Sequence, residues 1–151
     1  MSGAVMAFLH HLAAFTLVGA LGYEFIAFRR DLSVAEARRL QRVYIAYGIS
    51  AALLLIIGLL RVFYFGKGAS FYAQNWFFWT KMAGFALTAL LSVYPTVRII
   101  SWIKPLGRNE PPQITDREVS TIRFILRLEL VAVAIILFSA AMMARGLGMI
   151  S

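Results

Sequence analysis

Apolar residues along the chain fall into four long blocks separated by short polar segments. The blocks cover approximately residues 3–28, 43–65, 76–103 and 124–148. A helix needs about 20 apolar residues to cross a hydrocarbon core of ~30 Å, and each block is long enough. A soluble domain instead spreads its apolar residues by amphipathic periodicity. The pattern predicts an all-α integral membrane protein, a bundle of four transmembrane helices that forms a single membrane domain over residues 1–151.

Two polar stretches carry the signal of a helix start. Ser33 is followed three residues later by Glu36, and Thr115 by Glu118. This is the capping-box spacing, in which the hydroxyl and the carboxylate reciprocally satisfy free backbone N–H groups. Each box precedes about two turns of polar sequence before the next apolar block begins. We therefore expect the second and fourth helices to extend beyond the membrane.

The expected extensions cover residues 34–42 and 116–123. Pro95 lies inside the third block, where its missing N–H predicts a kink. Residues 104–112, KPLGRNEPP, contain prolines that cannot continue a helix, and they predict a true loop. Tryptophan is enriched at membrane interfaces, so Trp102 is expected at the interface on this side.

Composition supports a membrane protein and excludes several kinds of site. The chain has 151 residues, of which 61% are hydrophobic, and its mean hydropathy is +0.77. It has no cysteine. This excludes disulfides, thiol catalysis, cysteine-ligated zinc, iron–sulfur clusters and covalent attachment of c-type haem.

Basic residues concentrate in two of the three segments between blocks, and the net charge is +8. The remaining segment has little beyond Arg61 and Lys67. No basic residue precedes the first block, so we expect a membrane span there and not a cleavable signal peptide. Cytoplasmic loops are rich in Lys and Arg. We therefore expect the two basic loops to be cytoplasmic, and both termini and the Lys67 loop to be periplasmic. The basic groups are Arg29, Arg30, Arg38, Arg39 and Arg42, and then Arg98, Lys104, Arg108, Arg117 and Arg123.

This distribution predicts a multi-pass protein of the bacterial inner membrane. The expected partner is the lipid bilayer, with anionic headgroups in contact with the basic loops. We expect no binding to nucleic acid, because the positive charge follows the membrane topology.

Polar residues inside the blocks form two layers when depth is counted at ~1.5 Å per residue. All four blocks contribute to this pattern, as expected for a bundle with a polar interior. The outer layer contains His10, His11, Arg61, Lys81 and Arg145, and the inner layer contains Glu24, Arg42, Arg98, Arg127 and Glu129.

Each group in the outer layer has a structural explanation beside a functional one. Arg61 and Arg145 lie near helix ends, from which they can reach the membrane surface. Lys81 lies deeper, where a cation costs up to ~3 kcal/mol, so an anionic partner is the alternative to reaching outward. His10 is either a neutral histidine bonded to a backbone carbonyl or a ligand. His11 lies about 100° round the helix from it, so the two cannot point at one centre.

The inner layer predicts structural ion pairs. A buried carboxylate without a partner tends to become neutral. We expect Glu24 to be ionised and paired across helices with Arg127 or Arg42, and Glu129 to belong to the same group of structural charges.

The segments LHHLAAFTLVGALGYEF, RRLQRVYIAYGISAALLLIIGLLRVFYFGKG, NWFFWTKMAGFALTALLSVYPTVR and LRLELVAVAIILFSAAMMARG carry a resemblance. They resemble a family of bacterial four-span membrane proteins without an established activity (domain of unknown function 2214), over nearly the whole chain. More remotely, the order is similar to the HemJ-type protoporphyrinogen oxidases and the CopD membrane domains. These have a histidine in the first span, basic residues opening the second and a W-x-x-K-like element in the third.

The remote resemblance implies roles for particular residues. In the HemJ-type proteins the histidine of the first span is a haem b ligand, which would be His10 here. The third-span element departs from the pattern, because its tryptophan stands only two residues before the lysine. The other matching positions are Arg38, Arg39, Arg42, Trp79 and Lys81.

Three hypotheses follow for the function, and enzyme activity is left open. The first is a haem b protein with a redox or porphyrin-related role, in which His10 binds the iron and Lys81, Arg61 and Arg145 hold the propionates. A methionine or lysine would be the second axial ligand, and no spacing selects one. The second is an accessory subunit or assembly factor bound to other membrane subunits. The third is a transporter component that works as a homo-oligomer.

Overall fold

The computed structural model describes residues 2–65 and 68–150, in which four helical segments are long and apolar enough to cross a membrane. This confirms the predicted all-helical fold. The expected position of Lys67 lies outside the described residues. The long helices are α1 (Ser2–Ala27), α2 (Val34–Leu60), α4 (Trp76–Leu91) and α7 (Asp116–Ala144), and the short ones are the π-helical turn η1 (Arg61–Phe65), α3 (Ala69–Ala73), α5 (Val93–Ser101) and α6 (Ile103–Gly107).

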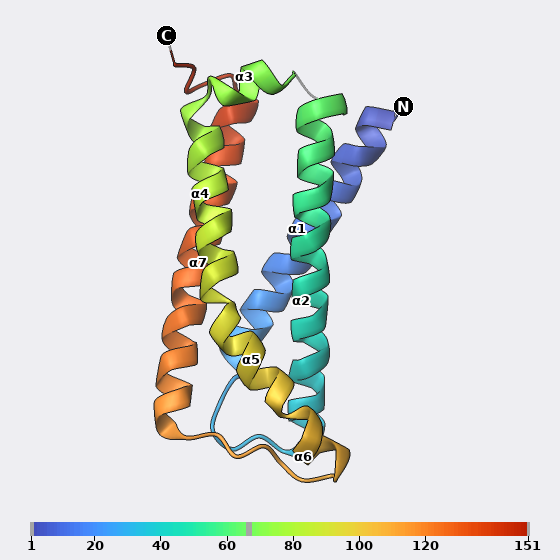
Figure 1. Cartoon of the computed structure of the whole chain (residues 1–151), viewed down its shortest axis with the longest axis vertical. Helices are drawn as coiled ribbons and strands as arrows, with labels where there is room; N and C mark the ends of the chain where they lie inside the picture. Colours follow the sequence, from blue (N-terminus) through green and yellow to red (C-terminus); the bar gives the residue numbers. More distant parts are fainter. Residues whose placement is uncertain (1, 66–67, 151) are drawn as a thin grey trace.

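The long helices form two packed pairs. α1 runs along α2, and α4 runs along α7 (Figure 1). α1 is tilted across the bundle, and the C-terminal part of α1 contacts α7. The start of α1 and the end of α7 lie at one end of the bundle, whereas α6 and the two basic connections lie at the other (Figure 1). We call these the outer and inner ends.

Both predicted capping boxes are formed. The Ser33 hydroxyl accepts from the Glu36 N–H at 3.3 Å, and the Ser33 N–H donates to the Glu36 carboxylate at 2.9 Å. In the second box the Thr115 hydroxyl accepts from the Glu118 N–H at 3.3 Å, and the Thr115 N–H donates to the Glu118 carboxylate at 2.8 Å. Glu118 also forms an ion pair with Arg98, so the start of α7 is fixed to α5.

The third membrane-crossing segment breaks close to Pro95. α4 ends at Leu91, Ser92 forms a turn, and α5 leaves in a new direction (Figure 1). Proline has no N–H to donate to the carbonyl four residues earlier, which explains the break one turn before it. α5 leans toward α2, and the Tyr44 hydroxyl lies 3.0 Å from the Ser92 carbonyl, which accepts its hydrogen bond. The predicted kink is therefore confirmed.

Trp102, expected at the interface on this side, lies between α5 and α6. Its side chain is buried and stacks on Phe28, with ring centroids 6.2 Å apart and an interplanar angle of 11°. It belongs to an apolar core that fills the inner end, together with Leu32, Leu40, Leu106, Ile114 and Ile122. The break after α5 turns the ring inward, and hydropathy along the sequence does not report that rotation.

The segment after α7 closes over the outer end of α4. Asn75 is fully buried, and its side-chain amide donates to the Leu147 carbonyl at 2.9 Å while its oxygen accepts from the Phe77 N–H at 3.0 Å. The Trp76 N–H donates to the Gly148 carbonyl at 2.8 Å. These bonds satisfy free N–H groups at the start of α4 and fix the end of the chain on it.

Replacing Gly148 by alanine is expected to lower the melting temperature in detergent more than the same change at Gly146. Both glycines have positive φ, +86° and +77°, which costs another residue roughly 1–2 kcal/mol. Only at Gly148 would the added Cβ meet a neighbour, lying 2.4 Å from Cδ2 of Phe77. Thermal unfolding followed by circular dichroism measures both variants. Equal losses would contradict packing of this segment on Phe77.

Candidate functional site

An elongated cavity of about 500 Å³ lies between the two helix pairs. It is lined by α1, α2, η1, α4, α5 and α7. Along α2 it extends from Tyr44 to Leu59, which is about 22 Å of helix. Most of its wall is apolar, including Leu54, Phe85 and Ile136. The cavity exists because α5 leans onto α2 while α4 stays on α7. Its volume falls within the ~300–1,000 Å³ typical of sites for cofactors and other small molecules.

Three polar side chains, which we call the outer cluster, lie near the outer end of the cavity: His10, Arg61 and Lys81. His10 and Lys81 line the cavity, and both Arg61 and Lys81 lie close enough to His10 to act on it electrostatically. The Lys81 ammonium lies 5.8 Å from the centroid of the Phe78 ring, a cation–π contact. The sequence therefore predicted correctly that His10 and Lys81 lie at one level.

The outer cluster has unsatisfied polar groups. Nδ1 of His10 is buried without a hydrogen-bond partner. In the part of the chain that the structure describes, neither Arg61 nor Lys81 has a carboxylate within ion-pair distance. Buried polar groups are normally satisfied. An anionic ligand with a group that binds the imidazole would satisfy both the buried nitrogen of His10 and the two cations beside it.

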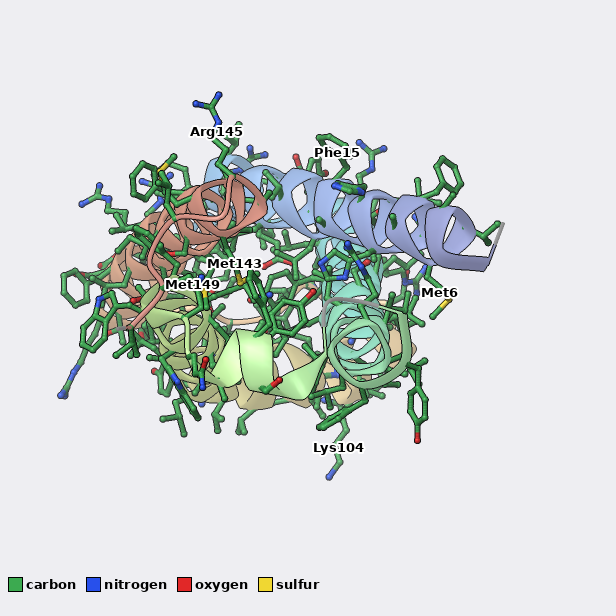
Figure 2. The ribbon with its side chains drawn as sticks, turned by 90° about the horizontal axis from the view of Figure 1, so that it is seen from above. Met6, Phe15, Lys104, Met143, Arg145 and Met149 are labelled. Carbon is green, nitrogen blue, oxygen red and sulfur yellow. The ribbon has the colours of Figure 1, made fainter. Side chains whose placement is uncertain are left out.

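His11 and Arg145 take no part in this cluster. His11 is exposed, and its Nδ1 lies 2.6 Å from the carbonyl of Ala7, so it points away from the cavity as expected. Arg145 was expected beside Lys81, but it is exposed and points away from the bundle (Figure 2). α7 ends at Ala144, and the chain turns outward there.

The inner layer differs from the expected ion pairs. Glu24 and Glu129 are buried, with 2% and 1% of their surface exposed. Both carboxyl oxygens of Glu24 and Oε1 of Glu129 lack hydrogen-bond partners. Arg127 and Arg42 are exposed, and among the described residues neither pairs with Glu24. Arg127 lies two residues from Glu129, about 200° round α7, so it faces the other way.

Two tyrosines of α2, which the sequence interpretation missed, line the inner half of the cavity. Tyr44 and Tyr47 are buried, with ring centroids 5.9 Å apart. The Tyr44 hydroxyl lies 2.8 Å from the Thr96 hydroxyl, in addition to its bond to Ser92. No described residue forms a hydrogen bond with the Tyr47 hydroxyl. The spacing of three residues, which puts both rings on one helix face, was the available signal.

The remaining positions implied by the remote resemblance lie away from the cavity. Arg38 donates to the carbonyl of Leu106 at 2.9 Å at the inner end. Arg39 and Arg42 are exposed there. Trp79 is 53% exposed and donates to the carbonyl of Ala73 at 2.9 Å. Of the matched positions, His10 and Lys81 line the cavity.

A metal site built from protein side chains alone is not found in the described residues, where no three His, Asp or Glu groups converge. His10 would therefore bind a metal only where most of the other ligands come from a cofactor and not from the protein. Met82 lines the cavity as well and offers a thioether.

Replacing Tyr44 by phenylalanine is expected to destabilise the protein by about 1 kcal/mol, because the carbonyl of Ser92 and the hydroxyl of Thr96 lose a partner. The matched change, Tyr47→Phe, removes no hydrogen bond between described residues, and we expect a smaller effect. Thermal unfolding in detergent measures both. A larger loss for Tyr47→Phe would contradict this account of the bend at Ser92.

Comparison with known proteins gives a family without an assigned chemistry. No curated protein and no solved structure matches the chain. One family, described as "Predicted membrane protein (DUF2214)", matches residues 2–148. The match covers all four membrane-crossing segments. The chain therefore belongs to this family of multi-pass membrane proteins.

Proposed function

We propose that this protein resides in the bacterial inner membrane and binds haem b in the cavity, with His10 as an axial ligand, for a redox or porphyrin-related role. The observation that supports this proposal is the outer cluster. It combines an imidazole at the wall of an apolar cavity with two cations that have no carboxylate partner among the described residues.

The residues present fit the chemistry of haem b. An imidazole is a common haem ligand, and the chain has no cysteine, which favours a group held without covalent bonds. The two propionates are anionic and need cations, which Arg61 and Lys81 would supply. The cavity walls are mostly apolar, as a macrocycle requires.

Each side chain has a distinct task in this arrangement. His10 would bind the iron, and Arg61 and Lys81 would neutralise the propionates. Phe78, already in contact with the Lys81 ammonium, would shield that ion pair from lipid. Haem, when bound, supplies one-electron chemistry that side chains cannot perform. An anionic partner also explains why a lysine stands in an apolar helix, because ion pairing offsets its desolvation.

The alternatives of an accessory subunit and a transporter component receive no specific support. Large apolar side chains such as Phe15 and Ile26 are exposed, at 76% and 79%, and Phe15 points outward (Figure 2). A bilayer covers such side chains in any membrane protein. They therefore do not identify a protein partner or an oligomer.

The visible absorption spectrum of purified protein, produced with ample haem, tests the proposal. We expect His10→Ala to lose the haem spectrum and His11→Ala to retain it. Lys81→Met should weaken haem retention about tenfold or more, since a charge-assisted hydrogen bond contributes ~1.5–3 kcal/mol. Arg145→Met, the same change outside the cavity, should leave retention unaltered. A folded wild-type protein without the spectrum would refute the proposal.

The orientation in the membrane forms part of the same proposal. The two basic connections lie at the end of the bundle opposite both termini (Figure 1), so the inner end is cytoplasmic and the outer end periplasmic. Single cysteines at positions 108 and 70 of this cysteine-free chain test it with a membrane-impermeant thiol reagent. We expect labelling at position 70 in intact cells, and at position 108 only after permeabilisation. Labelling of position 108 from outside would reverse the orientation.

A further inference from the structure

Two acidic side chains from different helices lie buried together in the inner half of the bundle. Glu24 belongs to α1 and Glu129 to α7, and their carboxyl groups are close enough to interact electrostatically. At 2% and 1% exposure both are more than nine-tenths buried. Three of their four carboxyl oxygens are buried without a hydrogen-bond partner.

No cation among the described residues compensates these carboxyl groups. Arg42 and Arg127 are exposed, and neither forms an ion pair with Glu24 or Glu129. Arg98 pairs with Glu118, and Arg123 donates to the carbonyl of Phe28 at 3.3 Å. The pair is therefore surrounded by apolar and neutral polar groups.

The titratable groups that face the pair from the neighbouring helix are tyrosines. Tyr44 and Tyr47 of α2 both lie within electrostatic reach of Glu24 and Glu129, and both line the cavity. The hydroxyl of Tyr44 is held by Ser92 and Thr96. Tyr47 has no such bond within the described chain, so its hydroxyl is available to donate or accept.

Burial without a cation determines the charge of the carboxyl groups. An ionised carboxylate in an apolar interior without a partner costs so much that it takes up a proton instead. Two carboxylates that share a site repel each other, which favours protonation of at least one. Protonation also gives a carboxyl group an O–H donor.

We propose that Glu24 and Glu129 form a proton-binding site inside the membrane, and that it exchanges protons with the cavity past Tyr47. In each event a hydronium ion gives one proton to a carboxylate oxygen and leaves one water, and the reverse step returns it. No bond between heavy atoms changes, and no other reactant is needed. The inference is independent of haem, because it uses neither His10 nor the outer cluster.

Infrared spectroscopy of the protein in liposomes tests the inference through the C=O stretching band of protonated carboxylic acids. At about pH 7 an ordinary glutamate is ionised, so we expect this band in the wild-type protein and its downshift in deuterated water. It should be lost in the double variant E24Q/E129Q and reduced in a single one. Glu110→Gln changes a carboxyl that pairs with Arg108 at 3.2 Å, and this control should leave the band intact.

Folding and cation binding are tested with the same samples. Glutamine resembles a protonated glutamate in shape and charge, so the variants should keep the wild-type melting temperature. If the double variant fails to fold, the reduction in either single variant still decides the matter. A folded wild-type protein without the band, or a band that persists in the double variant, would overturn the proposal. Absence of the band with a melting temperature that rises with sodium concentration would assign the site to a metal cation instead.

Discussion

At Ser92 the third membrane-crossing segment changes neighbours: α4 packs along α7, whereas α5 leans against α2. The hydroxyl of Tyr44 bonds the Ser92 carbonyl and the Thr96 hydroxyl at this point, which ties the bent segment to α2. Pro95 cannot donate to the carbonyl of Leu91, so the helix breaks there, and the bonds of Tyr44 fix the direction in which α5 continues. Because the segment diverges here, the two helix pairs separate above it and enclose the cavity. Tyr44, Ser92 and Thr96, which form the bend, all line this cavity.

The two polar sites of the bundle lack opposite charges. Among the described residues, the cations of the outer cluster have no carboxylate within ion-pair distance, and the acids of the inner pair have no cation within that distance. The two sets cannot satisfy each other, because His10 and Glu24 are separated on the continuous helix α1 by about 21 Å. On the two proposals made above, an anionic ligand would complete the outer cluster and protons would complete the inner pair. This arrangement explains why unpaired polar groups persist in a bundle that could have packed with apolar side chains.

The sequence predicted what depends on depth and local chemistry, and it failed where rotation about a helix axis decided the outcome. Hydropathy located the four spans, the Ser33 and Thr115 boxes located two helix starts, and Pro95 located the bend. Counting residues also placed His10 and Lys81 at one level. The same counting placed Arg145 with His10 and Lys81, but Arg145 points away from the bundle. It also placed Arg127 with Glu24, but Arg127 faces the other side of α7. The burial of Asn75 and Trp102 was not predicted, because their partners Leu147 and Phe28 are distant in the sequence.

The separation of the two sites determines how strongly they influence each other. Two unit charges about 20 Å apart interact by about 0.8 kcal/mol at an effective dielectric constant of ~20. That is less than the 1.36 kcal/mol that corresponds to one pKa unit. A change of one charge at the outer cluster therefore alters proton binding at Glu24 and Glu129 by well under tenfold. Strong coupling between the sites would require a movement of the helices, and the bend at Ser92, which contacts α2 through a few hydrogen bonds, is the part of the fold best placed to provide it.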